Sequence, residues 1–199
     1  INFDDSRCDF VAISAHKMAG PTGIGCLLVR KDAMEEMGPF MTGGSMIKSV
    51  TTQGSTFQEG HAMFETGTPR IAEAIGWGAA VEWLSQYDMN EVHSHIQEIA
   101  SWTAEKMQNI DGITIYGDPK HSNSSGAVSF LHSTIQSQDL ALLLDEGGFA
   151  VRTGHHCAQP LMDALGVPST NRISFWIYNT IEEAKSFVEH LEYVVKRFS

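Results

Sequence analysis

The sequence predicts an α/β protein in two parts, and three observations support this prediction. Near the N-terminus, short apolar runs end in turns rich in glycine and proline. Towards the C-terminus, short strand patterns alternate with helical patterns. The composition also changes near residue 87. We therefore expect residues 1–86 to form the end of an α/β layer and residues 87–199 to form a compact α+β domain.

Two strands are expected at the start of the first part. DFVAISAHK contains an apolar run over residues 10–13, and GPTGIGCLLVRK contains a second one over residues 24–29, after a turn at residues 20–23. Residues 38–68 hold many Gly, Ser and Thr residues with little periodicity. A segment of this kind predicts a long irregular loop, which in compact domains is usually functional or mobile.

GTP at residues 67–69 precedes a predicted helix that has Pro69 as its first residue and runs to about Gln86. Backbone N–H groups and the Thr68 hydroxyl there could bind an anion at the positive end of the helix. A plain helix cap followed by Pro69 is the simpler alternative. Because Gly76 and Gly78 lower helix propensity, we expect close packing on one face of this helix.

The second part is predicted to alternate helices with strands. Its first helix, over residues 89–108, follows Asp88, which is a suitable N-cap. The remaining predicted elements are strands at 112–116 and 126–131, a helix at 137–146, a strand at 149–152, a short helix at 159–165, a strand at 172–177 and a final helix at 181–198.

Composition limits the classes of function. With 42% hydrophobic and 19% charged residues among 199, the chain can bury a substantial core, which argues against wholesale disorder. Thirteen basic residues against 24 acidic ones give a formal net charge of −11, and there is no basic block. This charge argues against nucleic acid or an anionic membrane as the partner. Small molecules and other proteins remain.

Cysteine usage points to a reducing, cytoplasmic setting. Cys8, Cys26 and Cys157 are odd in number and widely spaced, so neither a disulfide framework nor a CxxC zinc pattern can be drawn. We expect neither a signal peptide nor a membrane span, because the longest apolar stretch is interrupted by Glu82. The chain begins with Ile1 and leads directly into a strand, so we expect it to begin inside a larger fold.

The tetrapeptide SAHK, Ser14 to Lys17, directly follows the first predicted strand. A lysine in a turn of small, hydrogen-bonding residues can form a Schiff base with a carbonyl compound if it is desolvated enough to be partly neutral. Ser14 and His16 beside it could donate to a phosphate. The alternative, a solvated lysine in a polar turn, is the commoner situation, because lysine side chains are mostly exposed.

The stretch RTGHHCAQP, residues 152–160, places Cys157 behind a glycine and two histidines. Metal binding is disfavoured, because neighbouring side chains of an extended chain point to opposite faces and no second ligand cluster lies at zinc spacing. The polar surroundings indicate a loop in which His155, His156 and Arg152 favour a nucleophilic thiolate. A buried structural cysteine is the alternative, because free cysteines are among the most buried residues. Local chemistry leaves both open.

Arg172 is followed by ISFWIYNT and opens the predicted strand over residues 172–177. An arginine at the mouth of an apolar strand can hold a carboxylate with two parallel hydrogen bonds. A surface ion pair is the alternative that the local sequence leaves open.

The order of these segments carries a resemblance to a known family. SAHKMAGPTGIG is followed by GGSMI, FETGTP, RTGHHCAQP and finally R-x-S-x-x-x-YNT at residues 172–180. In this order they resemble the PLP-dependent cysteine desulfurases of the SufS type (group II), which are relatives of the selenocysteine lyases. The resemblance runs over essentially the whole chain, and RTGHHCAQP is its most specific part.

The resemblance implies the aspartate-aminotransferase-like fold, which is PLP-dependent transferase fold type I. Residues 1–86 would be the C-terminal portion of the large PLP-binding domain, whose sheet in this family is mainly parallel and seven-stranded. Residues 87–199 would be the small C-terminal α+β domain with the cysteine loop. Family members continue upstream of the lysine by roughly a further domain's length, so the chain would be a C-terminal half.

By the same resemblance, Lys17 bonds covalently to pyridoxal 5'-phosphate and moves the substrate Cα proton. Ser14 and His16 match ligands of the PLP phosphate, and Thr68 matches a threonine given to the phosphate of the other subunit in a homodimer. No metal is implied.

On the substrate side, Cys157 matches the catalytic cysteine and Arg172 the arginine that holds the substrate carboxylate. Arg152 and His156 line the same loop and are assigned to substrate binding. The implied reaction converts L-cysteine to L-alanine and leaves a persulfide on Cys157, which passes to a SufE- or SufU-like acceptor for iron–sulfur cluster assembly. Two alternatives are a lyase acting on L-selenocysteine and a catalytically silent fragment that serves as a folding or interaction module.

Overall fold

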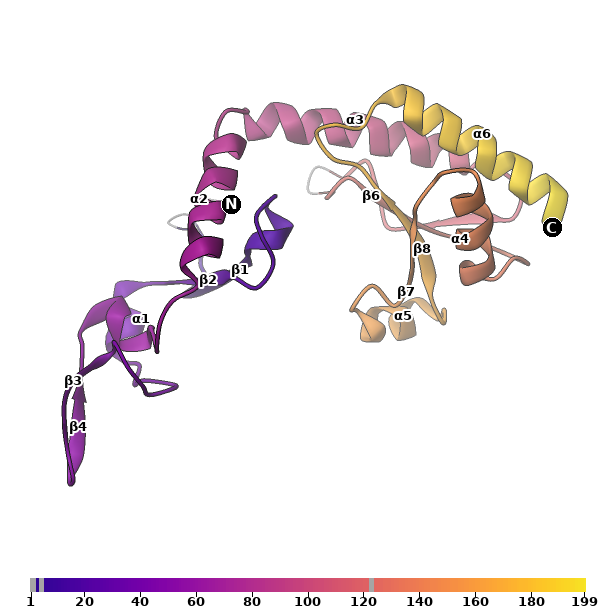
Figure 1. Ribbon diagram of the computed structural model, residues 1–199. Coiled ribbons are helices and arrows are strands. Elements are labelled where there is room, and N and C mark those ends of the chain that lie inside the picture. The colour runs from indigo at the N-terminus through magenta and orange to yellow at the C-terminus, as the bar shows by residue number, and fades with distance from the viewer. Residues whose placement is uncertain (1–2, 4–5, 122–123) are drawn as a thin grey trace. The chain divides into compact units, whose positions relative to one another are not determined.

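The chain divides into two compact units, Ile1–Tyr87 and Asp88–Ser199, which are described separately (Figure 1). The computed structural model describes residue 3 and residues 6–121 and 124–199. The sequence placed the boundary one residue earlier, between residues 86 and 87. No helix in the described residues is long and apolar enough to cross a membrane.

The first unit begins with an antiparallel pair formed by β1 (Phe10–Ser14) and β2 (Gly25–Val29). A short 3-10 turn, η1 (Ala15–Lys17), follows β1 directly. Gly25 is required where the two strands meet, because a Cβ at this position would lie 2.5 Å from Ile13 O. The two strands predicted here are confirmed.

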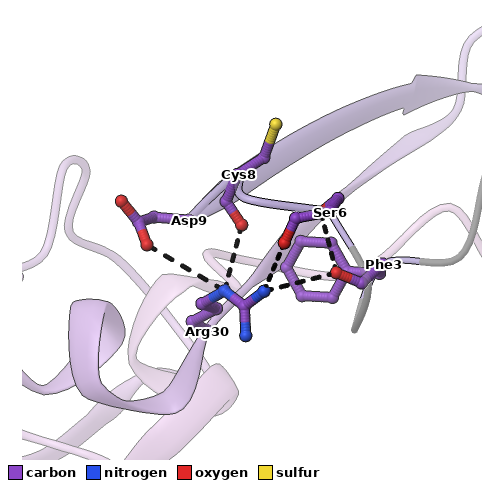
Figure 2. A network of polar contacts seen from close by, with 5 residues as sticks. All are labelled: Phe3, Ser6, Cys8, Asp9 and Arg30. Carbon is purple, nitrogen blue, oxygen red and sulfur yellow. Dashed lines mark hydrogen bonds and ion pairs between the residues drawn. The ribbon is translucent and has the colours of Figure 1, made fainter.

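Arg30, at the end of β2, fixes the segment that precedes β1 (Figure 2). Its guanidinium donates to the backbone carbonyls of Cys8 at 3.1 Å, Ser6 at 2.6 Å and Phe3 at 3.4 Å. Its Nε lies 4.0 Å from the Asp9 carboxylate, and its charge lies 5.4 Å from the centre of the Phe3 ring. One side chain therefore anchors the start of β1 through several contacts.

The segment that we expected to be irregular contains regular structure, so that prediction is wrong. β3 (Ile47–Thr51) and β4 (Gly54–Phe57) form an antiparallel hairpin. The hydroxyls of Ser49 and Thr56 are joined by a hydrogen bond of 2.7 Å across it. Residues with β-branched side chains favour strands here, but the hairpin is mostly exposed and therefore lacks the apolar alternation that marks a half-buried strand.

The described residues of the first unit also contain α1 (Lys31–Glu35), which the sequence did not predict, the 3-10 helix η2 (Gly60–Phe64) and α2 (Ile71–Leu84). Pro69 is not the first residue of α2, contrary to expectation. Arg70 is the N-cap with a non-helical ψ of 75°, so the helical hydrogen bonds begin with Ala74 N–H donating to Arg70 O. No residue of α2 is buried in this structure. An added Cβ would lie 3.6 Å from the ring of Pro21 at Gly76, whereas at Gly78 it would have no described atom within 4 Å, so the expected packing is found at Gly76 only.

The second unit is built on a four-stranded antiparallel sheet in the order β5-β6-β8-β7. Its strands are β5 (Ile113–Tyr116), β6 (Ala127–His132), β7 (Arg152–Gly154) and β8 (Thr170–Ser174). We predicted the last two at 149–152 and 172–177. Both predictions are displaced by two residues or more, because apolar residues next to these strands extend the apolar pattern beyond the hydrogen-bonded ladder.

Every strand pair in the described residues of both units is antiparallel. The described part of the chain therefore contains no parallel strand pair of the mainly parallel sheet that the resemblance implies for the large domain.

Four helices accompany the four-stranded sheet: α3 (Met89–Met107), α4 (Ser137–Glu146), α5 (Gln159–Leu165) and α6 (Ile181–Phe198). α3 packs against α6 and β6, and Figure 1 shows the two helices side by side. Asp88 is confirmed as the N-cap of α3, because its carboxylate accepts from Asn90 N–H at 2.8 Å.

The hydrophobic core of the chain lies in the second unit. Buried side chains of α3, α4 and α6 meet the buried face of β6. The ring of Phe187 meets Phe130 and Phe149 edge-on, with centroids 6.3 and 5.6 Å apart. This core supports β8 and β7, and the connection from β7 to α5 carries Cys157.

Candidate active site

Cys157 lies between β7 and α5, in an exposed loop. Its sulfur accepts a hydrogen bond of 3.3 Å from Arg152 Nη2. Ala158 N–H donates to His155 O at 2.9 Å, which closes a turn around the cysteine. The structure therefore places Cys157 in a loop, as its polar, glycine-flanked sequence predicted, and not in the core.

The backbone at this loop has an unusual conformation at two consecutive residues. His156 and Cys157 both have positive φ values, 56° and 62°. A non-glycine residue held in such a sparsely populated region costs of order 1–3 kcal/mol, and it persists only where surrounding contacts enforce it. Contacts that fix this loop therefore bear directly on the position of the thiol.

His156 makes such a contact. Its Nε2 lies 2.9 Å from the backbone oxygen of Thr170 and 2.9 Å from the Thr170 hydroxyl. Because a carbonyl oxygen can only accept, His156 donates from Nε2. In a neutral ring the Nδ1 atom is then an acceptor, and it is buried without a hydrogen-bond partner in the described residues.

Burial and the neighbouring charges favour the neutral form of this ring. Burial lowers the pKa of His156 from the ordinary value of 6.5, and the hydrogen bond to Thr170 opposes the change by raising it. The positive charges of Arg172, Arg152 and His155 lower the pKa further. A neutral imidazole with its proton on Nε2 agrees with the geometry of the Thr170 contact.

Two arginines face each other across neighbouring strands of the sheet. Arg152 in β7 is paired with Arg172 in β8, and Arg172 is also paired with Ser129 in β6. Residues directly opposite in an antiparallel sheet project from the same face, where like charges repel unless an anion lies between them. This face therefore suits a carboxylate.

Arg172 has a free donor for such an anion. Its Nε is buried and has no hydrogen-bond partner in the described residues. A carboxylate could satisfy it with the geometry that guanidinium groups favour. We expected Arg172 to open its strand. It lies instead in the middle of β8, because the strand begins at Thr170.

In the first unit, three candidate residues lie in consecutive elements at the end of β1. Ser14 is the last residue of β1, and His16 and Lys17 belong to η1, where both are exposed. The Ser14 side chain makes no capping hydrogen bond. A primary amine with a hydroxyl and an imidazole beside it is a donor set that fits PLP, which carries an aldehyde and a phosphate.

Thr68 lies in a groove of about 960 Å³ within the first unit. Its walls include Cys26, Arg70 and Trp77, but Ser14, His16 and Lys17 do not line it. Because α2 begins at Ile71, Thr68 is not at the N-terminus of that helix, and the predicted anion site at the positive helix end is not formed in this way.

The structure thus brings Arg152, His156, Cys157 and Arg172 together in the second unit. Ser14, His16 and Lys17 follow one another at the end of β1 in the first unit. Thr170 is not among the site residues that the sequence predicts. The available signal was strand alternation, since residues 170 and 172 lie on the same face of a strand, but we began that strand two residues too late. Within the described residues, no three His, Cys, Asp or Glu side chains are arranged to hold a metal ion.

This architecture and the motif order correspond to a known class of protein. Residues 1–187 match the aminotransferase class-V family, and the chain belongs to this family. Among its relatives, the cysteine desulfurase of Haloferax volcanii is 42% identical over 96% of this chain and 45% of its own length. A probable cysteine desulfurase of Halalkalibacterium halodurans is 44% identical over 96% of this chain and 47% of its own length.

Solved structures agree with these relatives. The cysteine desulfurase CsdA of Escherichia coli has a TM-score of 0.90 at 35% identity and is matched over 96% of this chain and 47% of its own. The cysteine desulfurase of Thermococcus onnurineus has a TM-score of 0.91 at 34% identity, over 96% of this chain and 48% of its own.

These likenesses confirm the fold class, PLP-dependent transferase fold type I, and the resemblance to cysteine desulfurases. The chain spans about half the length of the relatives that it matches.

Proposed function

We propose that this chain is the C-terminal part of a PLP-dependent cysteine desulfurase of the SufS type, which converts L-cysteine to L-alanine and leaves a persulfide on Cys157. The observation that carries the proposal is the Cys157 loop, in which an exposed thiol is contacted by Arg152. Arg152 is paired with Arg172 in the sheet. Relatives named cysteine desulfurase, at 42% identity and above, support it.

The two units take different parts in this proposal. Residues 1–86 belong to the large PLP-binding domain, and residues 87–199 form the small domain with the cysteine loop. The division of the chain between Tyr87 and Asp88 supports this assignment. The first unit carries the candidate cofactor residues and the second carries the candidate nucleophile.

The cofactor is PLP, which when bound supplies an electron sink for bonds broken at the substrate Cα and Cβ atoms. Lys17 holds it covalently, and Ser14 and His16 bind its phosphate. Thr68 contacts the phosphate bound by the other subunit of a homodimer. The position of Thr68 in a groove that Lys17 does not line supports a separate role.

The chain's own residues then divide the work on L-cysteine. Arg172, with Arg152 opposite it, holds the substrate carboxylate, and His156 lines the same pocket. Lys17 carries the proton to and from the substrate Cα as general acid and base. Cys157, as thiolate, attacks the substrate sulfur, so that an S–S bond forms while the substrate C–S bond breaks and alanine is released.

The persulfide on Cys157 passes to a SufE- or SufU-like acceptor for iron–sulfur cluster assembly. The exposure of Cys157 supports transfer to another protein. A reducing cytoplasm is the proposed location, which suits three free cysteines.

The first test of this proposal is PLP binding by the chain, followed by visible absorbance. We expect a band that is present in the wild type and in a Lys31→Ala control, an exposed lysine of the same unit, and absent in Lys17→Ala. A band of the same strength in Lys17→Ala would contradict the role of Lys17. Alanine release from L-cysteine and from L-selenocysteine then separates a desulfurase from a selenocysteine lyase.

A further inference from the structure

The Cys157 loop contacts the sheet of the second unit at Thr170. This residue is fully buried, and as the first residue of β8 it is paired with Gly154 at the end of β7. Its backbone oxygen and its hydroxyl both lie 2.9 Å from His156 Nε2. The residue before the cysteine is therefore bound to a side chain that the sheet holds in place.

The other contacts of the Cys157 loop hold its backbone less firmly than the hydrogen bond to Thr170 does. Arg152 reaches the sulfur from an exposed position, and an exposed charged side chain is held only weakly. The hydrogen bond from Ala158 to His155 closes the turn but does not attach it to the sheet. The hydrogen bond from His156 to Thr170 is the contact that ties the two left-handed residues to buried structure.

We propose that Thr170 is a positioning residue for the desulfurase reaction, which acts through His156 to hold Cys157 in the conformation that keeps its sulfur beside Arg152. The proposal rests on the proposed function, in which Cys157 is the nucleophile. The lowered pKa of His156 supports it, because a neutral ring with its proton on Nε2 donates to Thr170 and does not repel the neighbouring arginines.

Loss of the contact between His156 and Thr170 affects the Cys157 thiol through the charge of Arg152. Cys157 is already exposed, so loosening the loop gives a reagent no further access. It does move the sulfur away from the Arg152 guanidinium, whose Nη2 lies 3.3 Å from it and places a positive charge beside the attacking atom. Loss of the Thr170 hydroxyl should therefore slow the reaction of Cys157 with electrophiles.

The test is the rate at which iodoacetamide labels each cysteine of the 199-residue chain, resolved by peptide mass spectrometry. Thr170→Val removes the hydroxyl and keeps the side-chain shape. We expect it to slow labelling of Cys157 by about 3- to 10-fold, the effect of one hydrogen bond. Cys8 and Cys26, which are exposed in the first unit, serve as internal references with unchanged rates.

Two further variants separate positioning from stability. Thr170→Ser keeps the hydroxyl and should restore the wild-type rate. Thr103→Val removes another fully buried hydroxyl of the same unit, which donates to Ile99 O at 2.7 Å, and should leave labelling of Cys157 unchanged. Equal labelling in Thr170→Val and wild type, or equal slowing in Thr103→Val, would overturn the proposal.

A second route remains if Thr170→Val fails to fold. His156→Asn keeps a residue that tolerates positive φ but is too short to reach Thr170. It loses the contact to the backbone oxygen as well as the contact to the hydroxyl, so it should slow Cys157 labelling at least as much as Thr170→Val. In a stable background, the double variant should be no slower than His156→Asn alone, because that variant already lacks the contact to the Thr170 hydroxyl. Additive slowing would contradict the proposal. Labelling needs neither PLP nor substrate, so a chain that lacks desulfurase activity would overturn the proposed function without affecting this result.

Discussion

At the residue scale, the contacts around Cys157 differ in strength. The exposed contact from Arg152 contributes about 0.2–1 kcal/mol by analogy with exposed ion pairs. Two left-handed residues cost of order 1–3 kcal/mol each. The Arg152 contact alone is therefore too weak to impose the loop conformation, and the buried hydrogen bond from His156 to Thr170 has to contribute.

The lowered pKa of His156 predicts how stability depends on pH. Because the folded chain has a pKa for this group below 6.5, the unfolded chain binds the proton more tightly. The contribution of His156 to stability is therefore complete above 6.5 and is lost as the pH falls from there towards the folded-state pKa. The positive charges of Arg172, Arg152 and His155 act in the same direction.

Urea unfolding of wild type and His156→Asn at about pH 7.5 and about pH 5.5 measures this effect. The wild-type midpoint should fall more on acidification than that of His156→Asn, since the other histidines are common to both proteins. An equal fall in both proteins would show that His156 is not the group responsible.

Several site residues could be predicted at this scale because their chemistry is local. RTGHHCAQP already places an arginine and two histidines around a cysteine in a loop. Thr170 could not be found in this way, because its role depends on a hydrogen bond across 14 residues of sequence. The pairing of Arg152 with Arg172 likewise depends on the register between β7 and β8.

At the scale of elements, Gly126 sets how closely β6 approaches α3. It has a φ of 73°, and a Cβ there would collide with Ile96 Cγ2 of α3. Gly126→Ala should therefore add an overpacking penalty of about 1–3 kcal/mol to the penalty of a left-handed alanine, which is roughly 1–2 kcal/mol.

Gly148→Ala is the matched control for this prediction. Gly148 has a φ of 86° with no atom near its added Cβ, so only the backbone penalty applies. Chemical denaturation should rank wild type above Gly148→Ala and Gly148→Ala above Gly126→Ala. Equal stability of the two variants would mean that α3 moves away from β6 without cost.

Helices and strands could be predicted from the sequence where one of their faces is buried. Buried residues of α3 recur at helical spacing, and those of β6 alternate, so both patterns are visible in the sequence. The hairpin of β3 and β4 lies mostly in solvent and has no such pattern. The start of α2 was misplaced because Pro69 is compatible with a first helical position without requiring it.

At the scale of the whole molecule, the two units differ in how much apolar surface they bury. Among the described hydrophobic residues of the first unit, only Ala15 and Met46 are buried, while Leu27 and Ile75 are 52% and 71% exposed. The second unit holds the connected core. The chain spans about half the length of its relatives.

The persulfide on Cys157 can be detected from the mass of the Cys157 peptide after the chain has been incubated with PLP and L-cysteine. We expect the mass of one added sulfur atom on this peptide, removable by a reducing thiol and absent from the peptides of Cys8 and Cys26. The added sulfur should also be absent when Lys17 is replaced by alanine. Sulfur found equally on all three cysteines, or still present on Cys157 in Lys17→Ala, would contradict the proposed function.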